Sequence, residues 1–228
     1  MRWLVILCCL ITAGCSSRLP TEEERAVSKA ASSRTMEEVN YIEDANGLQW
    51  VSPQLALSDY QQIMVEPVGL HQRTQAVHQI PPAVLGRVSE RLQQRLEEEL
   101  AIGVPVVEVP GPKTATLKVE ISRASTDMED LKITEVLPYG ALIGGAKALL
   151  GTRDRNVRLL VESQLVDSQS DDILAERVSV LLAKDVLEND SEMLRFEQIQ
   201  ETVDRFTQDI VYFIRLTAYT AKENQDSF

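Results

Sequence analysis

Cys15 is the one residue of this chain whose neighbours specify a covalent reaction. An apolar run at 3–11 precedes it, and the small residues Thr12-Ala13-Gly14 stand directly before it. This arrangement is typical of a bacterial lipobox, where cleavage falls between Gly14 and a cysteine whose thiol carries a diacylglyceryl group. The run is far shorter than the ~20 apolar residues that cross a bilayer, which favours a cleaved signal over a membrane span. The alternative is an ordinary secretory signal followed by a coincidental cysteine.

The cysteine count agrees with a lipobox. The other two cysteines are Cys8 and Cys9, so removal of the signal leaves only the lipidated thiol of Cys15. We therefore expect no disulfide, no cysteine nucleophile and no cysteine metal ligand. Several acyl chains would anchor the protein stably, because a single chain binds only marginally. Ser16 stands where an aspartate commonly retains lipoproteins in the inner membrane, so we expect the periplasmic face of the outer membrane of a Gram-negative cell.

The other candidates for chemistry are histidines and carboxylates. His71 and His78 are too far apart for a helical zinc pair, which needs a spacing near four, so we expect no metal site. Carboxylates gather in two places, at Asp127, Glu129 and Asp130, and at Asp171 and Asp172. We expect solvated turn residues there and no catalytic set. The alternative is an envelope hydrolase that uses Asp127 and Asp130 as acid and base.

The segment from Val136 to Gly151 is apolar and rich in glycine and alanine. The sequence around Lys147 lacks the Gly-Lys-Ser/Thr order of a phosphate-binding loop, so we expect neither a nucleotide nor another cofactor. Such a segment either packs against its own sheet or forms an exposed apolar patch that docks a partner. On the second interpretation, the candidate partner-binding residues are Leu142, Ile143 and Gly144.

The charge balance excludes two classes of partner. The chain has 23 Lys and Arg against 35 Asp and Glu, for a net charge of −12. Nucleic-acid binding needs clustered basic residues, so we expect none. Attachment to the membrane is expected to rest on the acyl chains and not on anionic head groups. A basic surface on a partner protein fits this charge.

Composition divides the chain into three parts. Residues 1–14 form the signal peptide, 15–47 a lipidated cysteine with a flexible tether, and 48–228 a single globular domain. Within the tether, Thr21 and Glu24 have the spacing of a capping box, which predicts a short helix through about Ala31.

Hydrophobic periodicity predicts the order β-α-β-β-β-β-α for the globular domain. Strands are expected at 62–68, 104–109, 115–121, 156–166 and 173–183. A helix from Pro82 to about Leu100 and a final helix capped by Ser191 complete the set. The expected fold is α+β, with one mixed, mainly antiparallel sheet of about five strands and helices packed mainly on one face.

The final helix carries a narrow apolar seam from Phe196 to Phe213, with steps of three and four residues. This spacing is of the coiled-coil type. We expect the seam to pack on the sheet, and the alternative is that it joins two copies of the chain in a homo-oligomer.

Three short elements open the globular domain, namely Leu48-Gln49-Trp50-Val51-Ser52-Pro53, Ser58-Asp59-Tyr60 and Ile63-Met64-Val65-Glu66-Pro67-Val68. They resemble the Trp-x-x-Pro element, the Asp-Tyr pair and the strand ending in acidic-Pro-Val of a bacterial lipoprotein family known only as domain of unknown function 3313. The run at 105–112 and the hairpin at 156–183 fit as well. The resemblance implies a lipoprotein, and it assigns no functional residue because the family has no assigned activity.

Trp50 and Tyr60 flank a turn before the first expected strand. We expect them to clamp the tether onto the domain, and the alternative is an exposed binding hot spot. Taken together, these features predict a membrane-anchored, non-enzymatic lipoprotein whose domain binds a protein of the cell envelope. A self-associating structural protein and a hydrolase are the alternatives.

Overall fold

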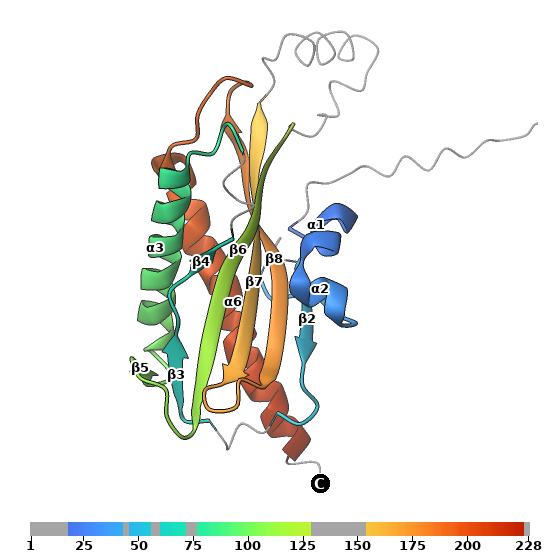
Figure 1. The fold of residues 1–228 in the computed structure, drawn as a ribbon, viewed down its shortest axis with the longest axis vertical. Helices are drawn as coiled ribbons and strands as arrows, with labels where there is room; N and C mark the ends of the chain where they lie inside the picture. The colour runs from blue at the N-terminus through green and yellow to red at the C-terminus, as the bar shows by residue number, and fades with distance from the viewer. Residues whose placement is uncertain (1–17, 43–45, 56–59, 72–76, 129–153, 226–228) are drawn as a thin grey trace, which may run out of the picture.

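One mixed sheet with helices on both faces forms the centre of the molecule (Figure 1). The computed structural model describes residues 18–42, 46–55, 60–71, 77–128 and 154–225, with side chains as far as Thr217. In chain order the elements are α1 (Glu22–Val27), α2 (Lys29–Ser33), β1 (Glu37–Asn40), β2 (Asn46–Val51), β3 (Gln62–Val65), β4 (Gly69–Leu70), α3 (Pro82–Leu100), β5 (Val106–Val107), β6 (Thr114–Met128), β7 (Arg155–Asp167), β8 (Ile173–Leu187) and α6 (Phe196–Gln225).

The sheet has eight strands in the order β1-β2-β8-β7-β6-β3-β5, with β4 also paired to β6. Pairing is antiparallel from β1 to β6 and parallel where β3, β4 and β5 join. The α+β class and the mixed sheet are therefore confirmed, and the expectation of about five strands is wrong. All five expected strands are present. The three additional ones are β1, β2 and β4. β1 has a single apolar residue and β4 has only two residues, while β2 alternates only at Leu48 and Trp50, so each gives a weak strand signal.

Three long antiparallel strands, β6, β7 and β8, form the middle of the sheet. Their alternating apolar residues place one set of side chains on each face. Asp167 shapes the turn between β7 and β8, because its carboxylate accepts hydrogen bonds from the backbone N–H groups of Gln169 and Ser170, both at 2.8 Å. The predicted hairpin is confirmed.

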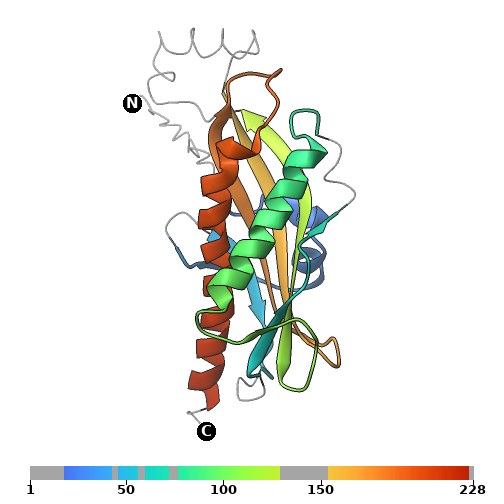
Figure 2. The same ribbon diagram turned by 90° about the vertical axis from the view of Figure 1, so that its left-hand side faces the viewer.

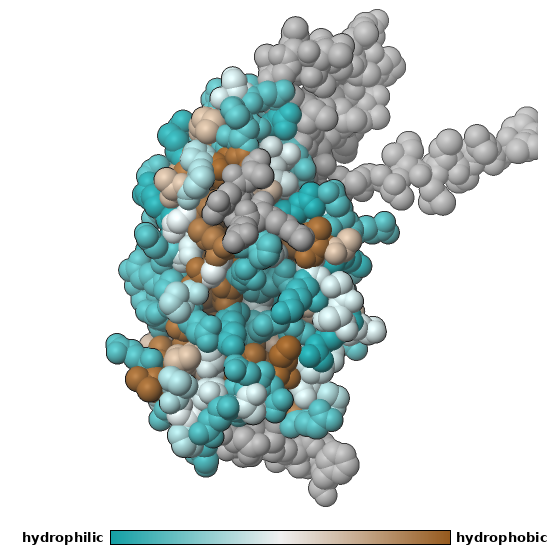
Figure 3. Space-filling view, in the orientation of Figure 1, coloured by the Kyte–Doolittle hydropathy of each residue, from teal (hydrophilic) through white to brown (hydrophobic). Residues whose placement is uncertain are grey.

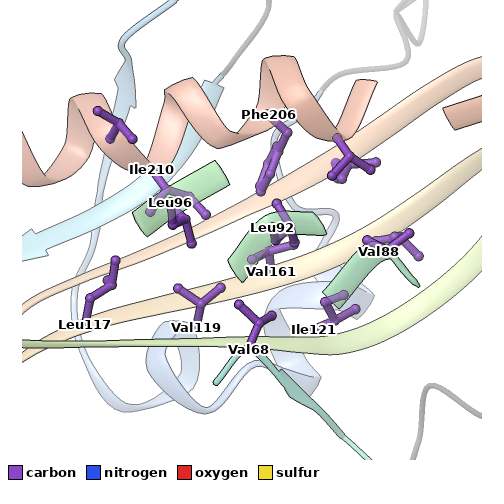
Figure 4. Packing of buried hydrophobic residues seen from close by; sticks show 14 of the residues in the cluster. Val68, Val88, Leu92, Leu96, Leu117, Val119, Ile121, Val161, Phe206 and Ile210 are labelled. Carbon is purple, nitrogen blue, oxygen red and sulfur yellow. The ribbon is translucent and has the colours of Figure 1, made fainter. Parts of the chain in front are cut away.

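α3 and α6 lie side by side on one face of the sheet (Figure 2). α3 begins at Pro82, where the missing N–H costs nothing, and its apolar stripe is fully buried. In Figure 4, Leu92 and Leu96 from α3 and Phe206 from α6 lie above Leu117 and Val161 of the sheet. Arg91 of α3 holds Asp204 of α6 through two hydrogen bonds of 2.6 and 2.8 Å.

The seam of α6 packs on the sheet, as expected. Every residue of the predicted set is buried, at 6% exposure or less: Phe196, Ile199, Val203, Phe206, Ile210 and Phe213. This seam therefore does not join two copies of the chain, because its side chains already contact strands of their own domain. The helix also begins at Phe196 and not next to Ser191, whose N–H and hydroxyl donate to the Asn189 side chain in the preceding loop.

The opposite face of the sheet is covered by α1 and α2. The predicted capping box is present: the Thr21 hydroxyl accepts from the Glu24 N–H at 3.2 Å, and the Glu24 carboxylate accepts from the Thr21 N–H at 2.8 Å. Ala30 of α2 is buried in a second, smaller apolar cluster with residues of β2, β7 and β8. The expectation of a flexible tether over 15–47 thus differs from the structure between residues 18 and 40, where the chain folds onto the sheet and adds β1 to its edge.

Polar and charged groups hold this N-terminal segment in place. The Arg158 guanidinium bonds to both carboxylate oxygens of Glu24, at 3.1 and 2.8 Å. Glu162 accepts from the Ser28 hydroxyl at 3.0 Å and from the Ala30 N–H at 3.2 Å. These partners are more than a hundred residues away in the chain, so no local sequence pattern predicts the contacts. The short run of apolar residues in this segment gives too weak a periodic signal for docking to be predicted.

Candidate functional site

Several residues singled out in the sequence lie outside the described residues. These are Gly14 and Cys15 of the lipobox, Leu142, Ile143 and Gly144 of the small-residue segment, and Glu129 and Asp130 of the first acidic cluster. The lipidation of Cys15 and the docking role of the small-residue segment therefore stay predictions.

Trp50 lies on β2 and holds the N-terminal segment. The Arg34 guanidinium lies 4.0 Å from the centre of the Trp50 ring, and the same group forms an ion pair of 2.6 Å with Glu176 of β8. Stacking of a guanidinium on an indole is a favourable cation–π contact. This geometry agrees with the expected clamp. A role of Trp50 in partner binding stays a prediction.

Tyr60 does not share in the expected clamp, because it lies in a different region from Trp50. Its ring packs against the core beneath α3 and α6, and its hydroxyl donates to the Asp167 carboxylate at 2.9 Å. Hydrogen bonds from the backbone N–H groups of Ser170 and Gln169, together with the Tyr60 hydroxyl, lower the pKa of Asp167. The two aromatic residues line separate pockets, so the structure does not bring them together as one hot spot.

The candidate carboxylates and histidines that the structure describes do not converge. Asp127 forms an ion pair of 3.3 Å with Arg158, and burial raises the pKa of its carboxyl group. Asp171 lies in the exposed hairpin turn, where Lys118 pairs with it at 2.9 Å. His71 uses its backbone N–H to bond the Ile121 carbonyl. Among the residues that the structure describes, no three His, Cys, Asp or Glu side chains are grouped so that they could hold a metal ion.

A partly apolar, open groove lies between the β1–β2 edge of the sheet and the last described turns of α6. We call it the edge groove. Its volume is about 570 Å³, and it is lined by Thr35, Glu37, Val39, Tyr41, Gln49, Trp50, Val51 and Leu216. The pairing of β1 with β2 places Glu37 opposite Gln49, so that the odd-numbered residues of both strands share the face toward α6. Leu216 forms the opposing wall and is 39% exposed.

The floor of the edge groove is fixed by a chain of buried contacts. The Tyr41 hydroxyl donates to the side-chain carbonyl of Gln49. The Arg177 guanidinium lies 4.6 Å from the centre of the Tyr41 ring. Arg177 is in turn bound to Asp209 of α6 at 2.6 Å, and both side chains are fully buried. Burial raises the pKa of Tyr41, so this phenol stays neutral at physiological pH.

One rim of the edge groove is an open strand. β1 pairs with β2 on one side and has no other partner among the described strands. An unpaired strand edge offers N–H and C=O groups to another chain. Glu37 and Glu38 on this strand are exposed and carry no ion pair within the described ranges, which gives the rim a negative charge.

Sequence reasoning found Trp50 but missed Val39, Tyr41 and Leu216. The alternation of Val39 and Tyr41 is a weak strand signal that the polar surroundings of this segment conceal. Leu216 follows Phe213 by three residues and reads as a continuation of the buried seam, yet it is 39% exposed. The helix is still buried at Thr217, so Leu216 lies beside the buried face and not on it.

These features define an α+β domain with an open, partly apolar groove at one edge of its sheet. The chain belongs to the family "Protein of unknown function (DUF3313)", whose model matches residues 27–210. It is 25% identical over 208 residues to the uncharacterized lipoprotein YdcL of Escherichia coli K12, covering 91% of this chain and 93% of that protein.

Two solved structures match much of this chain at low sequence identity. The hypothetical protein CT253 from Chlamydia trachomatis is 11% identical with a TM-score of 0.43, over 70% of this chain and 97% of that one. Protein XCC0632 from Xanthomonas campestris is 10% identical with a TM-score of 0.40, over 76% and 94% of the two chains. No helix within the described ranges is long and apolar enough to cross a membrane.

Proposed function

We propose that this protein is a non-enzymatic lipoprotein of the outer membrane, facing the periplasm, whose edge groove binds an extended segment of another envelope protein. The lipobox at Cys15 and the lipoprotein relative support the anchoring part of the proposal. The edge groove and the open strand beside it support the binding part.

The observation that carries the binding proposal is the position of the edge groove next to the open edge of β1. An extended peptide that joins a sheet edge gains main-chain hydrogen bonds, and side-chain pockets beside the edge select its sequence. Tyr41, Val51 and Leu216 offer an apolar pocket for one such side chain. A basic residue on the peptide would face Glu37, which lines the groove, while Glu38 lies on the other face of the strand. The expected ligand is therefore an extended segment that carries an apolar anchor and a neighbouring Lys or Arg.

The catalytic alternative receives less support. A hydrolase would use Asp127, but this carboxylate is bound to Arg158, which also holds Glu24. A carboxylate held in this way serves the docking of α1. Asp127 also lines none of the pockets described here.

Site-specific photocrosslinking in living cells tests the binding proposal. A photoreactive amino acid is placed at Thr35 and at Glu37, two exposed positions that line the edge groove, and at the exposed Glu90 of α3 as the control. We expect one discrete adduct with an envelope protein from the two groove positions and none from Glu90. An adduct with the mass of two copies would support self-association instead. The absence of any adduct from either groove position would contradict the proposal.

A matched pair of variants connects the adduct with the apolar wall. Leu216→Glu places a charge in the edge groove, whereas Tyr212→Glu changes an exposed residue one turn earlier on the same helix that does not line it. We expect Leu216→Glu to abolish the adduct and Tyr212→Glu to leave it in place. Equal effects of the two substitutions would contradict binding in the edge groove.

A further inference from the structure

A second pocket lies at the other end of α6 and differs from the edge groove in its charge. We call it the basic pocket. It has a volume of about 340 Å³ between the end of β8 and the first turns of α6, and it is lined by Arg18, Leu182, Lys184, Val186, Gln198, Glu201, Thr202 and Arg205. Three cationic side chains and one carboxylate give it a local charge of +2. This stands out in a chain whose net charge is −12.

The backbone fixes where this pocket lies relative to the predicted anchor. The Arg18 carbonyl accepts a hydrogen bond of 3.1 Å from the Val180 N–H, which holds the start of the described chain against β8. Cys15 is three residues before Arg18, and three extended residues span at most about 10 Å. The membrane surface at the lipidated cysteine must therefore lie within about 10 Å of the attachment point of Arg18.

Two of the three basic side chains of the pocket, those of Lys184 and Arg205, are available to a ligand. Lys184 is exposed and has no ion pair among the described residues. Arg205 is 64% exposed, and its only described ion pair is a 4.0 Å contact with Glu201 one turn away. Such a distant, exposed pair contributes little, so a phosphate group would compete for the guanidinium easily.

We propose that the basic pocket binds the phosphate of an anionic phospholipid in the membrane leaflet that carries the acyl chains of Cys15. This inference rests on the lipidation in the proposed function and is independent of the edge groove. The net charge of −12 alone led us to expect no contact with anionic head groups, but the local charge of +2 makes the basic pocket a favourable contact region for them within the described part of the chain. The domain is thereby docked on the membrane in one orientation.

The orientation has a consequence for the edge groove. Arg205 and Leu216 are eleven residues apart on α6, which is a rise of about 16 Å along the helix. With the basic pocket against the membrane, the edge groove points away from it into the periplasm. A partner segment can then reach β1 without contacting the bilayer.

Hydrogen exchange of the lipidated, full-length mature protein in nanodiscs tests this proposal. We compare discs of phosphatidylcholine with discs that also contain phosphatidylglycerol, and we follow peptides that cover 180–187 and 198–205. We expect phosphatidylglycerol to slow exchange in these peptides. Each of Lys184→Gln and Arg205→Gln should reduce this protection about fivefold, which corresponds to the ~1 kcal/mol of a basic residue near an anionic surface. Lys29→Gln removes the same charge from exposed α2 and should leave the protection unchanged.

Three outcomes would overturn the proposal. Exchange that is equally fast in both kinds of disc would show that the anionic lipid does not bind. Protection that persists in the Lys184→Gln, Arg205→Gln double variant would place the contact elsewhere. Protection by inorganic phosphate in phosphatidylcholine discs, equal to that by phosphatidylglycerol, would identify free phosphate as the ligand. The mass of the purified protein reports lipidation of Cys15 separately, so failure of the anchor is distinguished from failure of the pocket.

Discussion

Arg177 of β8 and Asp209 of α6 form a bidentate ion pair in the interior of the protein. The Arg177 Nη2 and Nε atoms donate to the two carboxylate oxygens of Asp209 at 2.6 and 2.9 Å, and neither side chain is exposed. The pair joins the helix to the sheet and also supports the Tyr41 ring at the floor of the edge groove. A buried charge that loses its partner is costly, so this pair makes the position of α6 on β8 specific.

Asp209→Asn should therefore lower the free energy of unfolding by about 3–5 kcal/mol, because it leaves the buried Arg177 charge uncompensated. Denaturant unfolding measures this change. Asp204→Asn is the matched control, since its ion pair with Arg91 is 30% exposed on the carboxylate side and should contribute no more than about 1 kcal/mol. Similar losses for the two substitutions would contradict a special role of the buried pair.

Gly47→Ala should destabilise the same region. A Cβ atom at Gly47 would lie 2.8 Å from the Arg177 Cζ and Nη2 atoms, and Asp209 prevents the guanidinium from moving away. We expect a loss of about 1–3 kcal/mol in the free energy of unfolding, as for other overpacked sites.

Gly86→Ala provides the control for this substitution. Nothing lies within 4 Å of a Cβ atom at Gly86, and the residue is inside α3, so the change should stabilise the protein by up to about 1 kcal/mol. Both variants are measured in the same denaturant series. If Gly47→Ala leaves the free energy of unfolding unchanged, the Arg177 guanidinium can move away from β2 without loss of stability, which would contradict this prediction.

The docking of α1 should depend on pH through Glu24. Burial alone would raise the pKa of Glu24, but hydrogen bonds from Arg158 and Thr21 lower it below the ordinary value of 4.5. A carboxyl group with a lowered pKa stabilises the folded state above its ordinary pKa and loses that contribution as the pH falls through the lowered value. The protection of residues 18–34 against hydrogen exchange, measured relative to the intrinsic exchange rate at each pH, should thus fall in acid, below a pH of about 4.5.

Three variants test the assignment to Glu24. Glu24→Gln should give fast exchange of residues 18–34 already at neutral pH. Glu23→Gln should keep the acid transition, because Glu23 is 77% exposed in its ion pair with Arg123. Asp127→Asn should also keep it, since burial raises the pKa of Asp127 and its contribution has the opposite sign. A transition that is unchanged in Glu24→Gln would contradict the assignment.

Phe206→Ala tests the packing of the α6 seam. The side chain is 1% exposed between α3 and the sheet, so truncation should cost about 3–5 kcal/mol in the free energy of unfolding. Because the seam packs within one chain, the midpoint of unfolding should not depend on protein concentration. Tyr212→Ala, at 41% exposure, should change stability by less than about 0.5 kcal/mol. A strong concentration dependence that Phe206→Ala removes would instead indicate an intermolecular seam.

Much of the fold can be predicted from the sequence, because its signals act within one element. The leucine spacing of α3, the alternation in β6, β7 and β8, and the capping box of α1 each depend on residues less than twenty positions apart. The lipobox at Cys15 is likewise a local pattern, and it determines where the protein is expected to reside.

The tertiary structure alone decided how these elements combine. β1 and β2 are strands because they can pair along β8, and the N-terminal segment docks because Glu24 meets Arg158, 134 residues away. The edge groove and the basic pocket both require α6 beside residues from the start of the chain. Periodicity records which face of an element is apolar, whereas strand pairing and buried charges depend on partners that only folding brings into contact.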